Sequence, residues 1–426
     1  MQLIGIDIGT TSICAVAIDK ESGALLQKRS VNSEADMEGK YPFEKLQDTE
    51  KIITLARSLL DELLTEDTVS IGVTGQMHGI VYLDRDGRAL SPLYTWQDKR
   101  ADEPYGDGTY ASHLGIFAGY GCASDFYNRE RGIRPTLATT FCTIHDYFVM
   151  TLTGRKVPLI HTTDAASLGC FDEESLTFSY DCSLEVTADY TVAGTYRGIP
   201  VGVAIGDNQA SVLSTLTDED SLLLNFGTGS QISLVSAKRI SAKNIECRPY
   251  FEGKHLIVGS ALCGGRAYSM LCDFYHAILS ESVDISKTKV YNIMEQMLLR
   301  DTEATLTVDT RFAGTREDSD IRGSITGIST ENLTPAALTR GVLCGMVEEL
   351  YGMYREMGEM RSSLTASGNA IRKNPALQRI VCDRFESEPR IPYHTEEGAY
   401  GAALFGALCA NVFASITEAQ ALICFQ

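Results

Sequence analysis

The pattern of apolar and polar positions at the start of the chain predicts two strands joined by a short turn. Residues 3–8 and 13–18 are apolar runs, and one carboxylate, Asp7, interrupts the first run. Short apolar runs bounded by turn residues are typical of buried strands. The turn between them consists of small and hydroxyl-bearing residues: Gly9, Thr10, Thr11 and Ser12. We therefore expect the chain to open with a β-hairpin.

Asp7 is the first candidate for a functional side chain. An ionised carboxylate in an apolar strand is costly unless a metal, a cation or hydrogen bonds compensate it. In the turn, Gly9 allows a ligand to approach the backbone, and the N–H and hydroxyl groups of residues 10–12 can point at one anion. An ordinary hairpin with a polar turn explains this stretch equally well when it is taken alone.

Helix and strand patterns alternate further along the chain. Apolar residues recur at helical spacing over 48–64. A β-branched run over 68–74 predicts a strand that ends in the polar loop Gly75-Gln76-Met77-His78-Gly79. The same patterns predict further elements: a strand at 80–83, helices at 143–150 and 340–360, a strand at 364–369, a helix start with an early proline at 373–377, and a helix opening at 396–404 whose small residues favour close packing.

The opening pattern returns in the second half of the chain. Residues 222–235 again contain two apolar runs around a Gly-Thr turn. The alignment superposes three pairs: Asn225 on Asp7, Gly227 on Gly9, and Thr228 on Thr10. Two such hairpins, each at the head of an α/β half, indicate a duplicated domain that grips one phosphorylated ligand from both sides. A chance recurrence of a common hairpin is the alternative, and it explains less.

Glycine-rich stretches indicate a domain boundary and a second place for a ligand. The Gly and Pro residues at 194–200 predict a boundary, with an N-terminal domain at 1–198 and a C-terminal domain at 199–426. Gly264 and Gly265 lead into a helix whose free N–H groups can meet an anion.

Length and composition limit the classes of protein to consider. A chain of 426 residues is too long for one compact core and favours two or three domains. Hydrophobic content of 44% with 22% charged residues is ordinary for a globular protein. The formal net charge of -19 argues against nucleic acid or an anionic membrane as the main partner, because both would be repelled.

Targeting signals and cysteine spacing indicate the compartment. No apolar run approaches the roughly 18 residues of a membrane helix, and the N-terminus lacks the basic start of a signal peptide. The 12 cysteines include no C-x-x-C pair and no tight Cys/His cluster. We therefore expect a cytoplasmic protein with free thiols and without a zinc site.

Four motifs, taken together and in their order along the chain, resemble those of the FGGY carbohydrate kinases. They are Ile6-Asp7-Ile8-Gly9-Thr10-Thr11, Gly206-Asp207-Asn208, Asn225-Phe226-Gly227-Thr228-Gly229, and the glycine turn at Gly368. The resemblance covers essentially the whole chain. It implies a two-domain α/β fold of the actin/hexokinase type (ribonuclease H-like), with a catalytic cleft between the domains.

The sugar loop narrows the resemblance within that family. The loop at 75–79 looks like that of xylulokinases and sedoheptulokinases, and three further stretches are more similar to sedoheptulokinases: residues 94–98, 143–147 and 163–167. Two residues depart from the family pattern. Lys99 stands where glycine is common, at the rim of the sugar pocket, and Ala366 replaces the first glycine of the adenosine motif. The chain also looks shorter than typical members.

The resemblance assigns roles to individual residues. Asp207 is the general base for the sugar hydroxyl, and Asp7 holds Mg²⁺ together with Asp207. Phosphate or nucleotide contacts are implied for Thr10, Thr11, Ser12, Gly227, Thr228, Gly229, Gly264, Gly265, Gly368 and Asn369, with Asn374 as a further candidate. Sugar contacts are implied for Gln76, Met77, His78, Trp96 and Asp98. No G-x-x-x-x-G-K-[ST] stretch occurs, so a Walker P-loop is excluded and the paired turns must hold the phosphates.

Structural roles remain open for several of these residues. Asp207 also fits a helix N-cap, and Met77 fits a core side chain. A single histidine is usually structural, although the glycine-flanked loop of His78 favours ligand contact. His145 and Asp146, on an apolar helix, are interpreted as structural or as neighbours of the site.

The predicted activity is transfer of the γ-phosphate of ATP to the terminal primary hydroxyl of a ketose. Sedoheptulose is the favoured ketose, and xylulose is the alternative. Its partners are then a small ketose and ATP, without nucleic acid or membrane, in a monomer or homodimer. A non-catalytic actin-fold protein that uses ATP as a switch is an alternative, but it has no use for the sugar loop or Asp207. A repressor-related glucokinase would need a zinc-binding cysteine cluster, which the sequence lacks. Hinge closure that excludes water is also expected.

Overall fold

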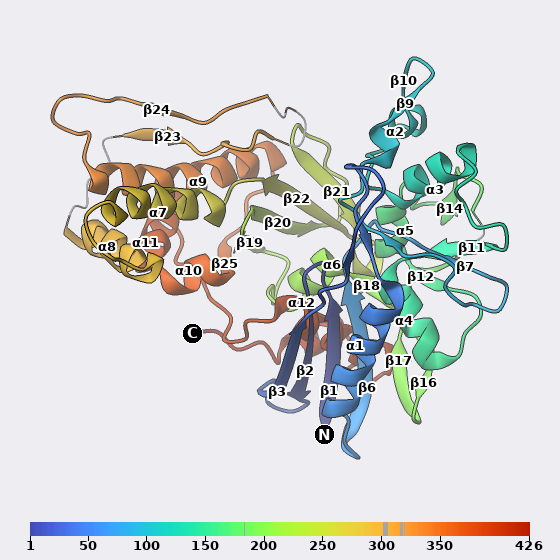
Figure 1. The fold of residues 1–426 in the computed structure, drawn as a ribbon. Helices are drawn as coiled ribbons and strands as arrows, with labels where there is room; N and C mark the ends of the chain where they lie inside the picture. The colour runs from blue at the N-terminus through green and yellow to red at the C-terminus, as the bar shows by residue number, and fades with distance from the viewer. Residues whose placement is uncertain (183, 301–305, 316–317, 319) are drawn as a thin grey trace. The chain divides into compact units, whose positions relative to one another are not determined.

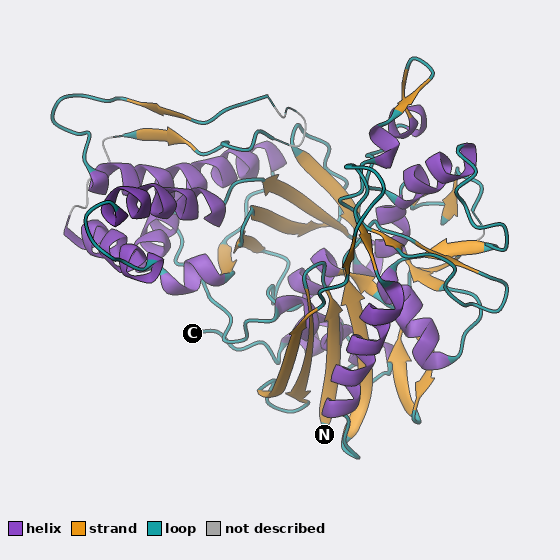
Figure 2. Cartoon of the chain, viewed as in Figure 1, coloured by secondary structure: helices purple, strands orange, loops and turns teal. Residues whose placement is uncertain are grey.

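The computed structural model describes residues 1–182, 184–300, 306–315, 318 and 320–426 (Figure 1). Their contacts divide the chain into two compact units. Unit 1 comprises Met1–Thr217, Pro249–Lys254 and Glu396–Cys424, and unit 2 comprises Asp218–Arg248, His255–Thr395 and Phe425–Gln426. Both units combine helices with sheets (Figure 2), as expected for an α/β fold. None of the described helices is long and apolar enough to cross a lipid bilayer.

Unit 1 is built on a seven-stranded sheet with the order β16-β17-β6-β1-β2-β3, in which β18 also pairs with β6. The strands of this sheet are β1 (Gln2–Ile8), β2 (Ser12–Asp19), β3 (Leu25–Asn32), β6 (Thr68–Gly75), β16 (Val192–Tyr196), β17 (Ile199–Gly202) and β18 (Ile205–Gly206). The helices of the unit are α1 (Thr49–Leu63), α2 (Tyr110–Leu114), α3 (Gly121–Glu130), α4 (Ile144–Thr153), α5 (Thr162–Leu168), α6 (Asp207–Leu213), α12 (Glu397–Cys409) and α13 (Ile416–Gln420), with the 3₁₀ turns η1 (Arg100–Asp102) and η2 (Phe251–Gly253). Shorter strands are β4 (Asp36–Met37), β5 (Leu46–Gln47), β7 (Val81–Leu83), β8 (Leu93–Tyr94), β9 (Pro104–Tyr105), β10 (Gly108–Thr109), β11 (Thr140–Cys142), β12 (Leu159–His161), β13 (Phe171–Asp172), β14 (Thr177–Phe178) and β15 (Glu185–Thr187).

One face of this sheet packs on α1. Ile4, Ile6 and Ile8 of β1 belong to a core that includes the apolar side of α1, at the helical spacing that the sequence predicted. Asp48 caps this helix by accepting a hydrogen bond of 3.0 Å from the N–H of Lys51. The predicted β-branched strand is β6, which runs parallel to β1.

The backbone of α12 packs directly against the backbones of β1 and β6. A methyl group in place of the α-hydrogen of Gly5 would lie 1.8 Å from the carbonyl oxygen of Ala399, and one on Gly72 would lie 1.7 Å from that of Ala402. Only glycine permits so close an approach. The predicted close packing of this small-residue helix is confirmed.

Unit 2 repeats the strand arrangement of unit 1. In its sheet, ordered β21-β22-β20-β19-β25, strand β19 pairs antiparallel with β20 and parallel with β25, as β1 does with β2 and β6. Asn225 of β19 lies opposite Gln231 and Ser367, and so takes the place that Asp7 has in β1. The repeat of the hairpin that the sequence predicted is therefore confirmed in the structure.

The elements of unit 2 surround a second hydrophobic core. Its strands are β19 (Ser221–Phe226), β20 (Ser230–Ser236), β21 (Ile245–Pro249), β22 (His255–Ala261), β23 (Thr307–Asp309), β24 (Ser324–Thr326) and β25 (Ser363–Ser367). Its helices are α7 (Gly265–Ser280), α8 (Lys287–Arg300), α9 (Pro335–Met357), α10 (Asn369–Lys373) and α11 (Pro375–Phe385). The helix predicted at 340–360 is α9, which begins earlier because Thr334 caps it and a proline follows at the first helical position.

The stretch at 194–200 forms the turn of a hairpin and not a link between the units. Strands β16 and β17 pair antiparallel, and Arg197 and Gly198 have positive φ angles of 50° and 85° in the turn. The contacts of the chain keep residues up to Thr217 in unit 1, past the boundary expected after residue 198. Glycine and proline mark tight turns as well as linkers, which explains the early position of the expected boundary.

Candidate active site

Three neighbouring parallel strands of unit 1 end at one edge of the sheet. Strand β6 lies between β1 and β18, and its Thr74 is opposite Asp7 on one side and Ile205 on the other. Carboxyl ends of parallel strands meet at the same edge, where ligands bind in open α/β sheets. The ends of β1 and β6 and the start of α6 therefore share this edge (Figure 1). Asp7, the loop after Gly75, and Asp207 lie on these elements, although they are far apart in the sequence.

Asp7 lies beside the first turn of α12. A methyl group on Gly398 would be 2.4 Å from Asp7 Oδ2, so glycine at this position leaves room for the carboxylate. Burial, followed by the charge of Asp207, raises the pKa of Asp7 to about 7 against the opposing effect of His145. Gly398 was not among the predicted site residues, because small residues in a helix are typical of packing alone. The acidic residues just before Gly398 were the sequence signal that could have identified it as a neighbour of the site.

Asp207 is the first residue of α6, and Gly206 is the N-cap of that helix. The N–H of Gly206 donates to the hydroxyl of Thr163 at 3.2 Å. On the neighbouring strand, the hydroxyl of Thr74 donates to the carbonyl oxygen of Ile205 at 2.7 Å. The backbone that carries Asp207 is thus held from two directions. The sequence left open that Asp207 is the N-cap of a helix, but Gly206 occupies that position.

Met77 and His78 have different surroundings in the loop after β6. Met77 is buried, and a methyl group on Gly206 would lie 2.6 Å from its Cε, so this side chain supports the end of β18. His78 has a positive φ of 75°, and its ring stacks on Tyr120 with 4.6 Å between the ring centres. Its Nδ1 lies 2.7 Å from the carbonyl oxygen of Ser167. Because a carbonyl oxygen only accepts, we assign the proton of the neutral ring to Nδ1.

The hydroxyl of Thr10 contacts residues predicted for the sugar. Trp96 Nε1 donates to Thr10 Oγ1 at 2.9 Å, and Thr10 Oγ1 donates to Gln76 Oε1 at 3.4 Å. Gln76 is buried and donates from Nε2 to Gln47 Oε1 at 2.9 Å. Trp96 is 44% exposed, so part of its indole is open to solvent. Thr10, expected at the phosphate, is thereby linked to two residues that were expected to bind the sugar.

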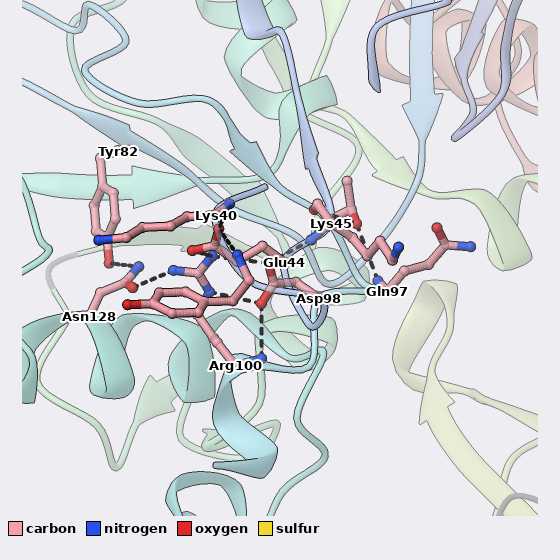
Figure 3. A network of polar contacts seen from close by, with 10 residues as sticks. Lys40, Glu44, Lys45, Tyr82, Gln97, Asp98, Arg100 and Asn128 are labelled. Carbon is pink, nitrogen blue, oxygen red and sulfur yellow. Dashed lines mark hydrogen bonds and ion pairs between the residues drawn. The ribbon is translucent and has the colours of Figure 1, made fainter. Parts of the chain in front are cut away.

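Asp98 lies at the centre of a buried polar network (Figure 3). Its carboxylate accepts hydrogen bonds from the Arg100 N–H, Nε and Nη2 at 3.0, 2.8 and 3.0 Å, and from the Lys45 N–H at 3.0 Å. Arg100 is 1% exposed and also donates to Asn128 Oδ1 at 2.6 Å. The predicted contact of Asp98 with sugar hydroxyls thus competes with these hydrogen bonds. Lys99, the departure from the family pattern, is exposed.

In unit 2 the start of α7 holds the second Gly-Thr turn. The N–H of Gly265 donates to the carbonyl oxygen of Gly227, and the N–H of Arg266 donates to that of Thr228, both at 3.0 Å. The prediction of a free N–H at this helix start is therefore wrong for Gly265, because its N–H is hydrogen-bonded to a carbonyl oxygen of the hairpin.

Two further predicted glycines pack against the same hairpin. A methyl group on Gly264 would lie 1.9 Å from Ser230 Oγ, and one on Gly368 would lie 2.5 Å from the carbonyl oxygen of Phe226. Gly368 also has a φ of 94°, which favours glycine. These glycines allow α7 and α10 to begin beside the turn.

A cavity of about 470 Å³ lies in unit 2 next to these helix starts. Its lining includes the predicted residues Gly265, Asn369 and Asn374, together with Tyr268, Tyr291 and Glu295. A cavity of this volume suits a small-molecule ligand or cofactor. The tyrosines were not predicted, because isolated aromatic residues on helices carry no motif. Ala366, which replaces the first glycine of the adenosine motif, belongs to the hydrophobic core of the unit.

Comparison with protein-family models identifies the family of the chain. The model of the FGGY family of carbohydrate kinases, N-terminal domain, matches residues 2–105, and the model of its C-terminal domain matches residues 222–410. The chain belongs to the FGGY family of carbohydrate kinases. It is a phosphotransferase with an alcohol group as acceptor, as the sequence predicted.

Individual relatives agree with this assignment. The FGGY kinase is 29% identical to a sedoheptulokinase of Homo sapiens, with 94% of this chain and 96% of that protein covered. It is 24% identical to a xylulose kinase of Staphylococcus xylosus, with 98% and 92% covered. A solved xylulose kinase from Lactobacillus acidophilus has a TM-score of 0.84 at 17% identity, over 100% of this chain and 92% of that one. The two-domain actin/hexokinase-like α/β fold is confirmed.

This FGGY kinase also contains a buried polar cluster behind the strand ends of unit 1. The cluster consists of His145, Asp146 and Asp164, and all three side chains are buried. Each offers one possible ligand atom, and these three atoms lie within 4.8 Å of one another. His145 Nε2 lies 2.9 Å from Asp164 Oδ1. Burial alone would lower the pKa of His145, but the charge and hydrogen bond of Asp164, together with the charges of Asp146 and Asp207, outweigh it and raise the pKa to about 9. Its Nδ1 would lie 3.1 Å from a methyl group on Gly75, so the cluster adjoins the loop at 75–79.

Proposed function

We propose that this kinase transfers the γ-phosphate of ATP to the terminal primary hydroxyl of a ketose, and that sedoheptulose is its preferred acceptor. The observation that carries the proposal is the arrangement of Asp7, the loop at 76–78 and Asp207 at the carboxyl ends of neighbouring parallel strands. The identity of 29% to a sedoheptulokinase over nearly the whole chain supports the choice of sugar.

Asp207 is the proposed general base. Its carboxylate accepts the proton of the attacking hydroxyl while the bond from that oxygen to phosphorus forms and the bond from phosphorus to ADP breaks. A positioned base contributes about 10²–10⁴ in rate. The partly exposed indole of Trp96 is the proposed platform for the C–H side of the sugar, and His78 and Gln76 are the proposed partners of its hydroxyls.

The acidic pair fits a divalent cation. Burial and the charge of Asp207 both disfavour ionised Asp7, and a nearby cation relieves both effects. Mg²⁺ prefers oxygen ligands and keeps part of its water shell, which suits two carboxylates. Asp7 and Asp207 are therefore the proposed holders of Mg²⁺, which neutralises phosphate charge when bound.

Unit 2 is the proposed nucleotide-binding domain, and unit 1 is the proposed sugar-binding domain. The cavity lined by Gly265, Asn369 and Asn374 is the proposed place of adenine and ribose. The turn at 227–229 and the turn at 10–12 supply the proposed phosphate contacts, because both combine glycine with hydroxyl side chains.

The test is ADP release with ATP, Mg²⁺ and a panel of ketoses and polyols. We expect sedoheptulose to give the highest kcat/KM, and Asp207→Asn to lower kcat by about 10²–10⁴ with little change in KM. Asp107→Asn makes the same change at an exposed turn position and should retain full activity. Undiminished kcat in Asp207→Asn would overturn the assignment of the base.

Xylulose is the alternative acceptor. The sequence similarity to a xylulose kinase is lower but extends over the whole chain, and the Gln76-Met77-His78 loop resembles both groups. A higher kcat/KM for xylulose than for sedoheptulose would decide for it. A non-catalytic ATP switch, the alternative of another class, predicts ATP binding without sugar-dependent ADP release.

A further inference from the structure

Three of the 12 cysteines gather in unit 1 as a thiol cluster, defined as Cys122, Cys170 and Cys182. Cys122, in the first turn of α3, is fully buried, and its Sγ lies 3.3 Å from the carbonyl oxygen of Gly169. That carbonyl belongs to the residue before Cys170, so the Cys122 thiol lies beside the backbone that carries Cys170. All three are free thiols. The cluster joins α3 to the segment that follows α5.

Cys170 and Cys122 differ in the way that a reactive thiol pair requires. Cys170 is partly exposed, and hydrogen bonding from Cys122 lowers the pKa of its thiol. The Cys170 thiol is therefore the one of the pair that a dissolved oxidant can reach, and its thiolate form is the nucleophile. Hydrogen bonds to the neighbouring sulfurs, together with burial, raise the pKa of Cys122, so it keeps its proton. An accessible thiol beside a second, buried thiol that can resolve its oxidised form is typical of redox-sensing cysteines.

The segments that carry these two cysteines also hold His78. Tyr120, the N-cap of α3 and two residues before Cys122, stacks on the His78 ring with an angle of 5° between the planes. Ser167, three residues before Cys170, accepts a hydrogen bond of 3.2 Å from the His78 N–H on its hydroxyl. A covalent bond between the cysteines would tie together the two supports of this histidine.

We propose that Cys170 and Cys122 form a reversible disulfide when the protein meets a peroxide, and that this bond disturbs sugar binding by His78. The effect on sugar rests on the proposed function, whereas the disulfide does not. A disulfide has an S–S length of about 2.05 Å, shorter than any contact between unbonded thiols. Its formation therefore draws the start of α3 and the end of α5 together, and Tyr120 and Ser167 move with them.

The chemistry balances with the peroxide as oxidant. The Cys170 thiolate attacks one peroxide oxygen, so an S–O bond forms, the O–O bond breaks, and hydroxide leaves and takes a proton to become water. The Cys122 sulfur then attacks the sulfenic sulfur of Cys170. An S–S bond forms, the S–O bond breaks, and the departing hydroxide takes the proton of Cys122 as a second water. Two thiols are oxidised and one peroxide is reduced; an added dithiol reverses the change.

Peptide mass spectrometry of the full chain tests the disulfide without any assay of activity. After treatment with hydrogen peroxide we expect one species that links the Cys122 and Cys170 peptides and is lighter by two hydrogen atoms, and its loss with dithiothreitol. Cys170→Ser and Cys122→Ser should not form it, whereas Cys424→Ser, which removes an exposed thiol elsewhere, should form it as the wild type does. A link through Cys182, or peroxide resistance with one zinc ion bound per chain, would overturn the proposed pairing.

Kinetics of the oxidised protein test the consequence for the sugar. We expect the KM for the ketose to rise about fivefold, the effect of losing one hydrogen bond, with the KM for ATP unchanged. Dithiothreitol should restore the original value, and Cys170→Ser should not respond to peroxide. An unchanged sugar KM in protein whose disulfide is complete would overturn this part. If no sugar supports turnover, the proposed function fails while the mass measurement still decides on the disulfide.

Discussion

Thr163 links the buried His161 to the backbone of the proposed base. Its Oγ1 accepts the N–H of Gly206 at 3.2 Å and lies 3.0 Å from His161 Nδ1. Thr163→Val keeps the shape of the side chain but removes the acceptor, which leaves a buried N–H unpaired beside Asp207. We expect kcat to fall about tenfold with little change in the sugar KM, because the base loses its position.

Steady-state kinetics of two variants at this position separate the hydroxyl from the packing. Thr163→Ser retains the hydroxyl and loses a methyl group, so it should recover most of the wild-type kcat. If the serine variant were as slow as the valine variant, the methyl group would be the important part, and the positioning role would be refuted.

His161 makes the stability of the fold depend on pH. It is fully buried, and burial lowers its pKa to about 4. In the unfolded chain the pKa lies near 6.5, so between these two values the unfolded chain binds more protons than the folded one. Stability from this group is thus complete above pH 6.5 and is lost as the pH falls toward 4. At pH 5 the expected loss is about 2 kcal/mol.

Urea unfolding at pH 7 and pH 5 checks this expectation. His161→Asn removes the titrating group and keeps a side chain that can cap a helix, as His161 does for α5. The wild type should lose about 2 kcal/mol more than the variant between the two pH values. Equal losses in both proteins would show that other groups cause the acid sensitivity.

At the scale of elements, the network around Asp98 fixes the segment from β8 to η1, which carries Trp96. Arg100 supplies most of the donors to this buried carboxylate, and its guanidinium lies 4.2 Å from the centre of the Tyr94 ring. Arg100→Met leaves the carboxylate buried without its ion-pair partner. We expect unfolding of unit 1 to become easier by about 3–5 kcal/mol, the usual cost of breaking a buried ion pair.

Lys99→Met is the matched control, because it removes a positive charge one residue away at an exposed position. Its free energy of unfolding should change by less than about 0.5 kcal/mol. Chemical denaturation of both variants provides the measurement. A small effect in Arg100→Met would mean that the segment does not depend on this ion pair.

At the scale of the whole molecule, the sequence predicted what its local patterns determine. The two hairpins, the helix that Asp48 caps, and the strand that leads into the loop at 75–79 follow from apolar periodicity and turn residues. The placement of Asn225 on Asp7 followed as well, because the same alternation surrounds both Gly-Thr turns. Local patterns therefore identified both the repeat and the strand edge of unit 1.

Contacts between distant segments were beyond such patterns. Residues 396–424 return to unit 1, and Gly398 meets Asp7 there, but a helix of small residues does not reveal its partner. Asp98 illustrates the same limit, since its residue type fits a sugar ligand and its surroundings show an ion pair with Arg100. The carbonyl that accepts the Gly265 N–H also comes from a distant turn.

The proposed assignment of the nucleotide to unit 2 is open to a test with two glycines. Gly265 lines the cavity, and a methyl group there would lie 2.6 Å from the carbonyl oxygen of Gly227. Gly265→Ala must therefore push the start of α7 away from the turn. We expect the KM for ATP to rise about tenfold and the KM for the sugar to stay unchanged, since overpacking costs about 1–3 kcal/mol.

Gly352→Ala is the control within the same unit. In α9 its methyl group would meet no atom of the described residues within 4 Å, and alanine is the better helix former. Its two KM values should equal those of the wild type, with stability raised by up to about 1 kcal/mol. Initial rates with ATP and sugar varied in turn give both constants for each variant. If Gly265→Ala raised the sugar KM and left that for ATP unchanged, the nucleotide would have to bind elsewhere, because this substitution alters only the turn and the cavity of unit 2.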